Sequence, residues 1–157
     1  MRKGLIIASL VSATIAVTGT AFAGGHSSPE GQAIAARQAH MALYGFNLGP
    51  LGQMAQGKME YDAATATAAA ANLAALANMD LSAYWLEGTD SSMGNTRAKA
   101  AIWEDADGFA AEIQKMAAAA TALSAVAGDG LDALRGAFAG VGASCGSCHE
   151  AYRGPRQ

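Results

Sequence analysis

The sequence predicts an all-α protein, folded as an antiparallel four-helix bundle with one long crossover loop. Three observations lead to this fold class. Four segments carry apolar residues at helical spacing, and no segment shows the alternation of a β-strand. Glycine-containing breaks separate the segments, and the second is rich in alanine, which favours helix. Amphipathic helices of this kind commonly pack as a bundle that holds a ligand between facing helices.

The first 23 residues have the features of a signal peptide. Arg2 and Lys3 precede an apolar run over residues 5–17, and the small-x-small sequence Ala21-Phe22-Ala23 follows. The run is too short for a typical transmembrane helix. We expect cleavage after Ala23, which leaves residues 24–157 as one domain in the periplasm. An uncleaved anchor stays open as the alternative.

Charge and hydropathy exclude two classes of partner. The chain of 157 residues has a formal net charge of −3, and losing Arg2 and Lys3 would make it more acidic. Nucleic-acid binding usually needs a basic face, which this composition does not favour. After the signal peptide no apolar run is long enough to cross a membrane. We expect neither nucleic acid nor a membrane span.

The first helix is expected to begin at Pro29, with Ser28 as its N-cap. Its apolar positions recur every seven residues, at Ile34, Met41 and Leu48. Gly49-Pro50 interrupts the pattern, but the spacing resumes after it, so a kink is expected there and not an end. Gly57 is expected to close the helix.

The second helix is predicted from a cap at Asp62 to about Asn78. Its larger core residues are Leu73, Leu76 and Met79. From Asp80 to about Ala101 the chain is irregular and contains glycines and a Thr-Asp-Ser-Ser cluster. A loop of this length in a compact domain usually has a function, such as covering a pocket.

The third helix is predicted from about Glu104 to Val126. Its residues in helical register are Phe109, Ile113, Met116, Ala120 and Leu123. Gly128-Asp129-Gly130 separates it from the fourth helix, which is expected to run from Leu131 to about Arg153. The fourth helix places Leu134, Phe138, Val141 and Cys145 on one face.

The most informative motif is Cys145-Gly146-Ser147-Cys148-His149, near the end of the fourth predicted helix. The chain has 2 cysteines, and their three-residue offset puts both on one helix face. Cys-x-x-Cys-His is the attachment pattern of a c-type haem: each thiol adds to one haem vinyl group and the histidine reaches the iron. The motif predicts one covalently attached haem c near the C-terminal helix, with His149 as the proximal axial ligand.

Three other uses of a Cys-x-x-Cys pair fit this chain less well. A thioredoxin-like pair opens a helix in a βαβ unit, and a structural zinc site needs further thiols or histidines at close spacing. A disulfide across two intervening residues is strained. In an oxidising compartment the two thiols would tend towards such a disulfide unless a cofactor captured them first.

Together with the predicted bundle, the motif is similar to the attachment site of the class II c-type cytochromes. These comprise cytochrome c′ and low-spin relatives of the cytochrome c-556 type. The resemblance covers essentially the whole chain after the signal peptide. Its blocks are Arg37-Gln38, Tyr61-Asp62-Ala63-Ala64, Ile102-Trp103, and Val141 to Cys145 with Cys148-His149 and Tyr152-Arg153. Gly146-Ser147 departs from the family, where a basic residue is common, and should alter the surface near the haem edge more than the chemistry.

The resemblance implies roles for residues distant from the motif. In the family the residue four positions after the first-helix arginine faces the distal side of the haem, and here it is Met41. A methionine there resembles the axial ligand of the c-556 type, so we expect Met41 opposite His149. Thioether ligation would raise the reduction potential. Arg37 and Gln38 are expected near the haem propionates, and Arg153 beside the proximal imidazole.

Other interpretations of these residues stay open. Met41 also fits a flexible core methionine, and Arg37 an ordinary solvated arginine. His40 competes as a distal ligand but lies about one hundred degrees around the helix from Met41, so we expect an exposed or hydrogen-bonded surface histidine. His26 falls in the N-terminal segment and is the weaker competitor. Three aromatic residues line the pocket or belong to the core: Trp103, Phe109 and Phe138.

Two functions follow from the resemblance. The first is single-electron carriage in the periplasm by a haem with His/Met ligation, through weak and transient contacts with redox partner proteins. The second is a five-coordinate cytochrome c′ that binds nitric oxide or carbon monoxide. The sequence shows no catalytic constellation, so we do not expect an enzyme. The family resemblance also permits a homodimer through the first two helices.

Overall fold

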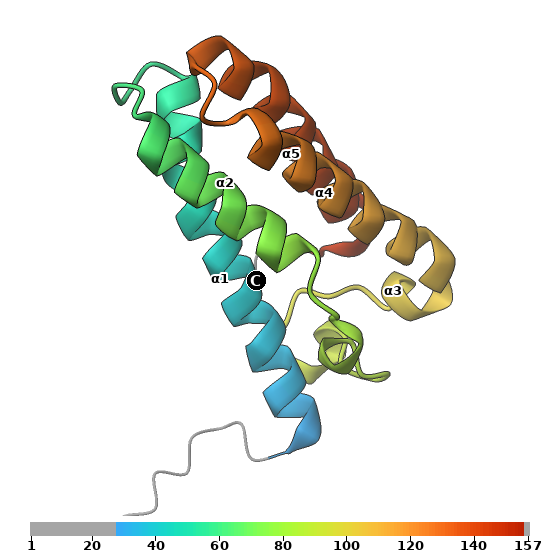
Figure 1. Ribbon diagram of the computed structural model, residues 1–157. Coiled ribbons are helices and arrows are strands. Elements are labelled where there is room, and N and C mark those ends of the chain that lie inside the picture. Colours follow the sequence, from blue (N-terminus) through green and yellow to red (C-terminus); the bar gives the residue numbers. More distant parts are fainter. Residues whose placement is uncertain (1–27, 156–157) are drawn as a thin grey trace, which may run out of the picture.

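The computed structural model describes residues 28–155 and confirms the predicted fold class, because four long helices form a bundle (Figure 1). These helices are α1 (Pro29–Ala55), α2 (Ala63–Ala77), α4 (Ala106–Val126) and α5 (Leu131–Tyr152). α1 packs against α2 and α5, and α4 also packs against α2 and α5. The predicted signal peptide lies outside the described residues. Within them, no helix is long and apolar enough to span a membrane.

α1 begins and continues as the sequence predicts. The Ser28 side chain accepts a hydrogen bond from the Gly31 amide at 3.1 Å and so caps the helix. The helix passes through Pro50 without ending, and it stops before Gly57, whose φ of +70° suits glycine. The side chain of Asp62 caps α2 in the predicted way.

The main core lies between the four long helices. Its large fully buried side chains come from every one of them: Leu51, Met54, Leu73, Leu123, Leu134 and Val141. Alanines such as Ala66 and Ala70 are fully buried on α2, and their small side chains let the neighbouring helices approach closely. The Tyr61 hydroxyl donates to the Ala127 carbonyl at 2.9 Å and accepts from the Gly130 amide at 3.0 Å. It thereby ties the α1–α2 turn to the α4–α5 turn.

The chain between α2 and α4 is a long crossover, as predicted, but it is more structured than the sequence indicates. It contains two 3₁₀ turns, η1 (Ser82–Tyr84) and η2 (Ser91–Met93), and the short helix α3 (Ala101–Glu104). The predicted start of the third helix at Glu104 is therefore wrong in detail. Asp105 leaves helical geometry and its side chain accepts a hydrogen bond from the Gly108 amide, which caps α4 as a separate helix.

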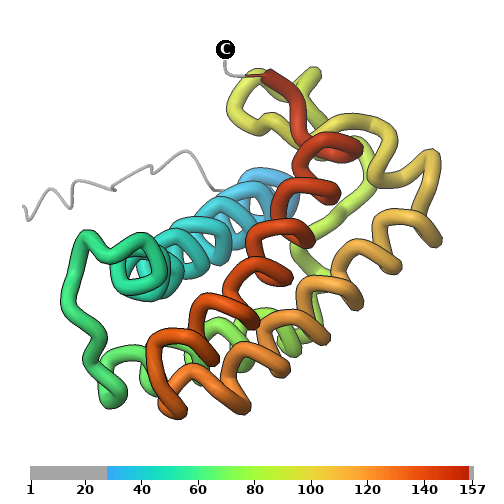
Figure 2. The backbone as a smooth tube through the Cα atoms, turned by 90° about the horizontal axis from the view of Figure 1, so that it is seen from above, coloured from blue at the N-terminus to red at the C-terminus, as the bar shows by residue number. Residues whose placement is uncertain are grey.

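The crossover is held against the C-terminal end of α5. Figure 2 shows these two segments, yellow and red, side by side at one end of the bundle. Ala98 and Arg153 form an isolated antiparallel bridge. The Lys99 ammonium donates to the carbonyls of Glu150 and Ala151, at 2.8 and 3.0 Å. A cation at a helix C-terminus is favourable, so Lys99 stabilises the turn of α5 that follows the cysteine motif.

Gly108→Ala is expected to lower the free energy of unfolding by about 1–2 kcal/mol. A methyl group at Gly108 would collide with the carboxylate of Asp105 and the hydroxyl of Tyr152, which hydrogen-bond each other at 2.7 Å. The α4 cap would have to open. Chemical denaturation measures the change. Gly140→Ala on α5 is the control, since nothing lies within 4 Å of its added methyl group, and it should be neutral or stabilising. Equal losses in both variants would contradict the prediction.

Candidate haem-binding site

A cavity of about 500 Å³ lies between α1, α4, α5 and the crossover. All the site residues predicted from the sequence border it: Arg37, Gln38, Met41, Cys145, Cys148, His149 and Arg153. The cavity walls are mainly apolar, and its size is within the usual range for sites of organic cofactors. The fold thus brings α1 residues together with a motif more than a hundred positions later in the chain.

The two cysteines lie on one face of α5, as their spacing predicts. Both are half-buried free thiols that border the cavity. Burial raises the pKa of each thiol, and for Cys148 the negative charges of Glu112 and Cys145 raise the pKa further. The thiols are therefore protonated at neutral pH. They stand unpaired at the cavity wall, where a vinyl-bearing cofactor can reach both.

His149 follows the second cysteine and borders the same cavity. Burial lowers the pKa of its imidazole, and the positive charges of Arg153 and Arg97 lower it further. A lowered pKa favours the neutral imidazole, whose free nitrogen lone pair is what a metal ion binds. The electrostatic surroundings of His149 thus suit a metal ligand.

Arg37 is buried, with 4% of its surface exposed, and its charge ties α1 to the crossover. Its guanidinium donates to the Thr89 hydroxyl at 2.7 Å, to the Thr89 carbonyl and to the Thr96 hydroxyl at 2.8 Å. It also lies over the Trp85 ring, 5.0 Å from the ring centroid. The interpretation of Arg37 as a solvated arginine is therefore wrong. Gln38 is exposed, and its amide donates to the Asn95 carbonyl of the crossover at 2.7 Å.

Arg37→Leu is expected to lower the free energy of unfolding by about 2–4 kcal/mol, since it leaves buried hydrogen-bond acceptors of the crossover without a donor. Chemical denaturation of the haem-loaded protein measures the change. Arg135→Leu is the matched control, because Arg135 is exposed and makes one hydrogen bond, to the Ala55 carbonyl at 2.8 Å. The control should lose less than about 1 kcal/mol. Similar losses would show that Arg37 does not hold the crossover.

Donor groups without an acidic partner gather along the rim of the cavity. Arg37, Arg97 and Arg153 border it, and within residues 28–155 none of them forms a salt bridge. The Trp85 indole nitrogen is buried and has no hydrogen-bond partner among residues 28–155. Haem carries two carboxylates, which the positive charge of these arginines favours, although the terminal nitrogens of Arg37 already donate to the crossover. The residues present therefore fit a haem.

The α1 wall of the cavity carries Met41, Tyr44 and Leu48. Met41 is 43% exposed, and its side chain faces the cavity opening and is not enclosed in the core. The interpretation of Met41 as an ordinary core methionine is therefore wrong. Burial, then the charge of Cys145, raises the pKa of Tyr44 to about 12, so its phenol stays neutral. The part of the α1 wall from Met41 to Leu48 is therefore uncharged, whereas Arg37 borders the cavity one turn earlier.

His40 differs from the sequence expectation. It is neither exposed nor hydrogen-bonded through Nε2, because 4% of its surface is exposed and Nε2 is buried without a partner among the described residues. Its ring packs edge-on against Tyr44 and Tyr84, with centroids 4.7 and 6.0 Å apart. The 3₁₀ turn η1 covers this side of α1, which the sequence did not indicate. His40 is not among the residues that border the cavity.

Sequence reasoning missed several residues of this cavity. Arg97, Glu112 and Met116 border it, and none belongs to a motif. The Glu112 carboxylate accepts hydrogen bonds from Lys115 and from Ser147, the latter at 2.6 Å, and these bonds lower its pKa. Helical register had already placed Met116 on the apolar face of the third predicted helix, and it could have placed Glu112, four residues earlier, beside it. Of the three predicted aromatic residues Phe109 borders the cavity, whereas Trp103 and Phe138 do not.

The fold and the site together define a class of protein. A helical bundle that carries Cys-x-x-Cys-His on its last helix, facing a cavity bordered by three arginines, is a c-type haem protein. Residues 32–153 match the family model described as Cytochrome C′. The chain belongs to the cytochrome c′ family, whose members carry one covalently attached haem c with its iron.

Individual relatives agree with this assignment. A cytochrome c′ of Cereibacter sphaeroides is 42% identical over 121 residues, which cover 76% of this chain and 81% of the relative. A cytochrome c-554 of the same organism is 43% identical over 123 residues, covering 76% and 91%. A solved structure of cytochrome c′ from Rhodobacter sphaeroides has a TM-score of 0.79 at 41% identity, covering 81% of this chain and 98% of that chain.

Proposed function

We propose that this protein is an exported haem protein that binds a small gas molecule, nitric oxide or carbon monoxide, on the α1 side of its cavity. The observation that carries the proposal is the α1 wall, where Met41, Tyr44 and Leu48 offer uncharged side chains. Uncharged side chains disfavour a charged ligand and suit a small neutral molecule.

Residues on different sides of the cavity would have different roles in holding the haem. Cys145 and Cys148 would hold the haem through thioether bonds, and His149 would be the axial ligand on the α5 side. Haem iron, when bound, exchanges one electron between its ferric and ferrous states and takes a gas molecule at an open axial position. Arg37 would orient the cofactor through its carboxylates, together with Gln38 and Arg153.

Similar proteins support gas binding at an open iron site more than the closed, low-spin site of the cytochrome c-556 type. A solved cytochrome c prime from Alcaligenes xylosoxidans, 36% identical with a TM-score of 0.72, is a nitric oxide complex of a variant protein. The relatives compared above are named cytochrome c′ and cytochrome c-554. The expectation of a low-spin, c-556-like member therefore gives way to the cytochrome c′ assignment.

Single-electron carriage with His/Met ligation remains the second candidate, because one observation favours it. Met41 places a thioether, a possible iron ligand, at the wall of the cavity that His149 also borders. In that case both axial positions would be filled and gas would be excluded. The protein would then exchange electrons with redox partner proteins through small, transient interfaces. Neither candidate requires an enzymatic step.

Absorption spectroscopy tests the two candidates against each other. Under the first, the resting ferric protein should show a high-spin spectrum, and the ferrous protein should bind carbon monoxide on titration. A low-spin resting spectrum with the weak far-red band of sulfur ligation, and no uptake of carbon monoxide, would overturn gas binding in favour of electron carriage.

We also propose that the protein lies in the periplasm after removal of residues 1–23. There it forms a homodimer through the outer face of α1. Phe46 is 78% exposed there and Leu43 49%. A similar cytochrome c′ structure describes ligand-controlled dimer dissociation. Phe46→Lys should convert a dimer to a monomer in analytical ultracentrifugation, since a charge would be buried at the contact. Ala111→Lys is the control: Ala111 is exposed on α4, and its substitution should leave the dimer intact. If Phe46→Lys does not affect the dimer, the interface lies elsewhere.

A further inference from the structure

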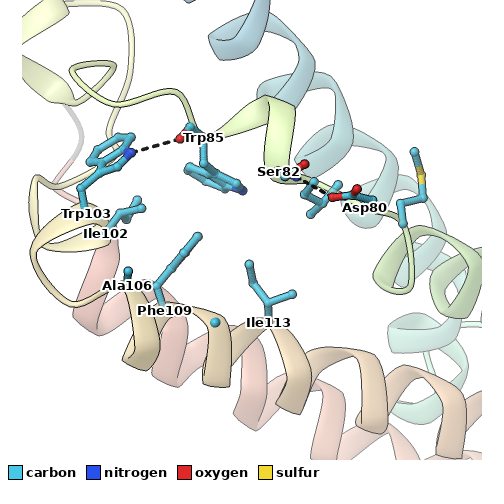
Figure 3. A pocket seen from close by; sticks show the side chains of 11 residues that line it. Asp80, Ser82, Trp85, Ile102, Trp103, Ala106, Phe109 and Ile113 are labelled. Carbon is cyan, nitrogen blue, oxygen red and sulfur yellow. Dashed lines mark hydrogen bonds between the residues drawn. The ribbon is translucent and has the colours of Figure 1, made fainter.

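A second cavity, of about 560 Å³, adjoins the haem cavity on the side of the crossover and α4. We call it the outer pocket. The two cavities share five residues, which form the wall between them: Leu81, Trp85, Ile102, Phe109 and Ile113. Figure 3 shows Trp85 reaching in from the crossover and Phe109 and Ile113 reaching in from α4 on the opposite side.

The outer pocket runs from the surface to this shared wall. Met79, Asp80 and Ser82 border it and are exposed, whereas Ile102 and Phe109 are buried. Trp103 closes another side, held by a hydrogen bond from its indole nitrogen to the Trp85 carbonyl at 3.1 Å (Figure 3). The pocket therefore leads from solvent to side chains that also face the haem cavity.

We propose that the outer pocket is the entry route of gas molecules into the haem cavity, and that they collect in it before they pass the shared wall. This inference rests on the proposed gas-binding function. The pocket is lined mainly by apolar side chains, in which small apolar molecules dissolve better than in water. Elsewhere the haem cavity is rimmed by Arg97 and by the exposed Arg153, where charge and the haem carboxylates disfavour an apolar molecule.

The shared wall can open by side-chain motion alone. Trp85 and Phe109 meet edge to face, with ring centroids 4.8 Å apart, and this contact joins the crossover to α4. The aliphatic side chain of Ile113 stands beside them and needs only a rotamer change to move. No helix has to shift for a diatomic molecule to pass.

Ala110→Trp tests the route, because Ala110 borders the outer pocket but not the haem cavity. The indole should fill the pocket while the haem surroundings stay unchanged. The association and dissociation rates of carbon monoxide on the ferrous protein should both fall severalfold, by the same factor, with the equilibrium affinity and the absorption spectrum unchanged. Ala111→Trp, an exposed neighbour that borders neither cavity, is the control and should keep wild-type rates.

Xenon provides a readout that does not depend on gas binding at the iron. In xenon-pressurised crystals of the haem-loaded protein, xenon should occupy the outer pocket of the wild type and be absent from Ala110→Trp. A wild type without xenon there, or wild-type carbon monoxide rates in Ala110→Trp, would overturn the route. A wild-type protein that takes up no carbon monoxide but binds xenon would instead overturn the proposed gas-binding function.

Discussion

Changing both Cys145 and Cys148 to serine is expected to abolish covalent haem attachment completely. The two thiols border the haem cavity from one face of α5, and a hydroxyl group does not form the stable thioether bond that a thiol forms with a haem vinyl group. After denaturing gel electrophoresis, haem staining at the position of the protein should disappear. Each single serine variant should keep one thioether and shift the pyridine haemochrome band to longer wavelength, because one vinyl group stays conjugated with the ring.

Gly146→Ala is the matched control for the cysteine variants. Gly146 lies between the two cysteines, is exposed, and has nothing within 4 Å of an added methyl group. This variant should retain the covalent haem and the wild-type band position. Haem staining that survived in the double serine variant would contradict attachment at this motif, and loss of staining in Gly146→Ala would show that the assay reports export or folding instead.

Met41→Ala is expected to raise the association rate of carbon monoxide about tenfold, the change that about 1.4 kcal/mol of lost steric contact produces. The side chain borders the haem cavity, and its removal widens the space on the α1 side. The resting ferric spectrum should stay high-spin, since the proposal leaves the thioether sulfur unbound. Stopped-flow mixing and absorption spectroscopy measure the two quantities.

The same variant separates the two candidate functions. If the Met41 sulfur is the distal ligand, its removal should convert a low-spin protein that excludes carbon monoxide into a high-spin protein that binds it. Leu43→Ala is the control, because Leu43 is half exposed on α1 and does not border the cavity. An unchanged association rate in Met41→Ala would show that Met41 neither binds the iron nor shields it.

Local sequence signals predicted the helices well, because they act over a few residues. Ser28 and Asp62 cap the helices that they were expected to cap, and their side chains need only the next turn of the chain to do so. The start of α4 was misplaced because a short separate helix, α3, precedes Asp105, which caps α4 and also accepts a hydrogen bond from the Tyr152 hydroxyl. The cap on Gly108 is local and could have been predicted, whereas the contact with Tyr152 joins residues that are distant in sequence.

In the haem site, too, the features that depend on neighbouring residues were predicted, and those that depend on helix packing were not. Cysteine spacing and the adjacent histidine identified the cofactor and the α5 side of the site, since these groups are neighbours on one helix turn. The burial of His40 beneath Tyr84, and the contributions of Arg97 and Glu112, were not predicted. They depend on where the crossover and α4 lie relative to α1 and α5, which periodicity does not specify.

The sequence by itself determined that this protein is a helical bundle with an attachment motif for haem c, because helical periodicity, caps and a five-residue motif are local properties of the chain. Only the tertiary structure decided what surrounds that haem. Packing put Met41 at the cavity wall and not in the core, and it buried Arg37 under the crossover. It also placed a second cavity behind Trp85 and Phe109. Side chains that are distant in sequence acquire their surroundings only when the helices pack.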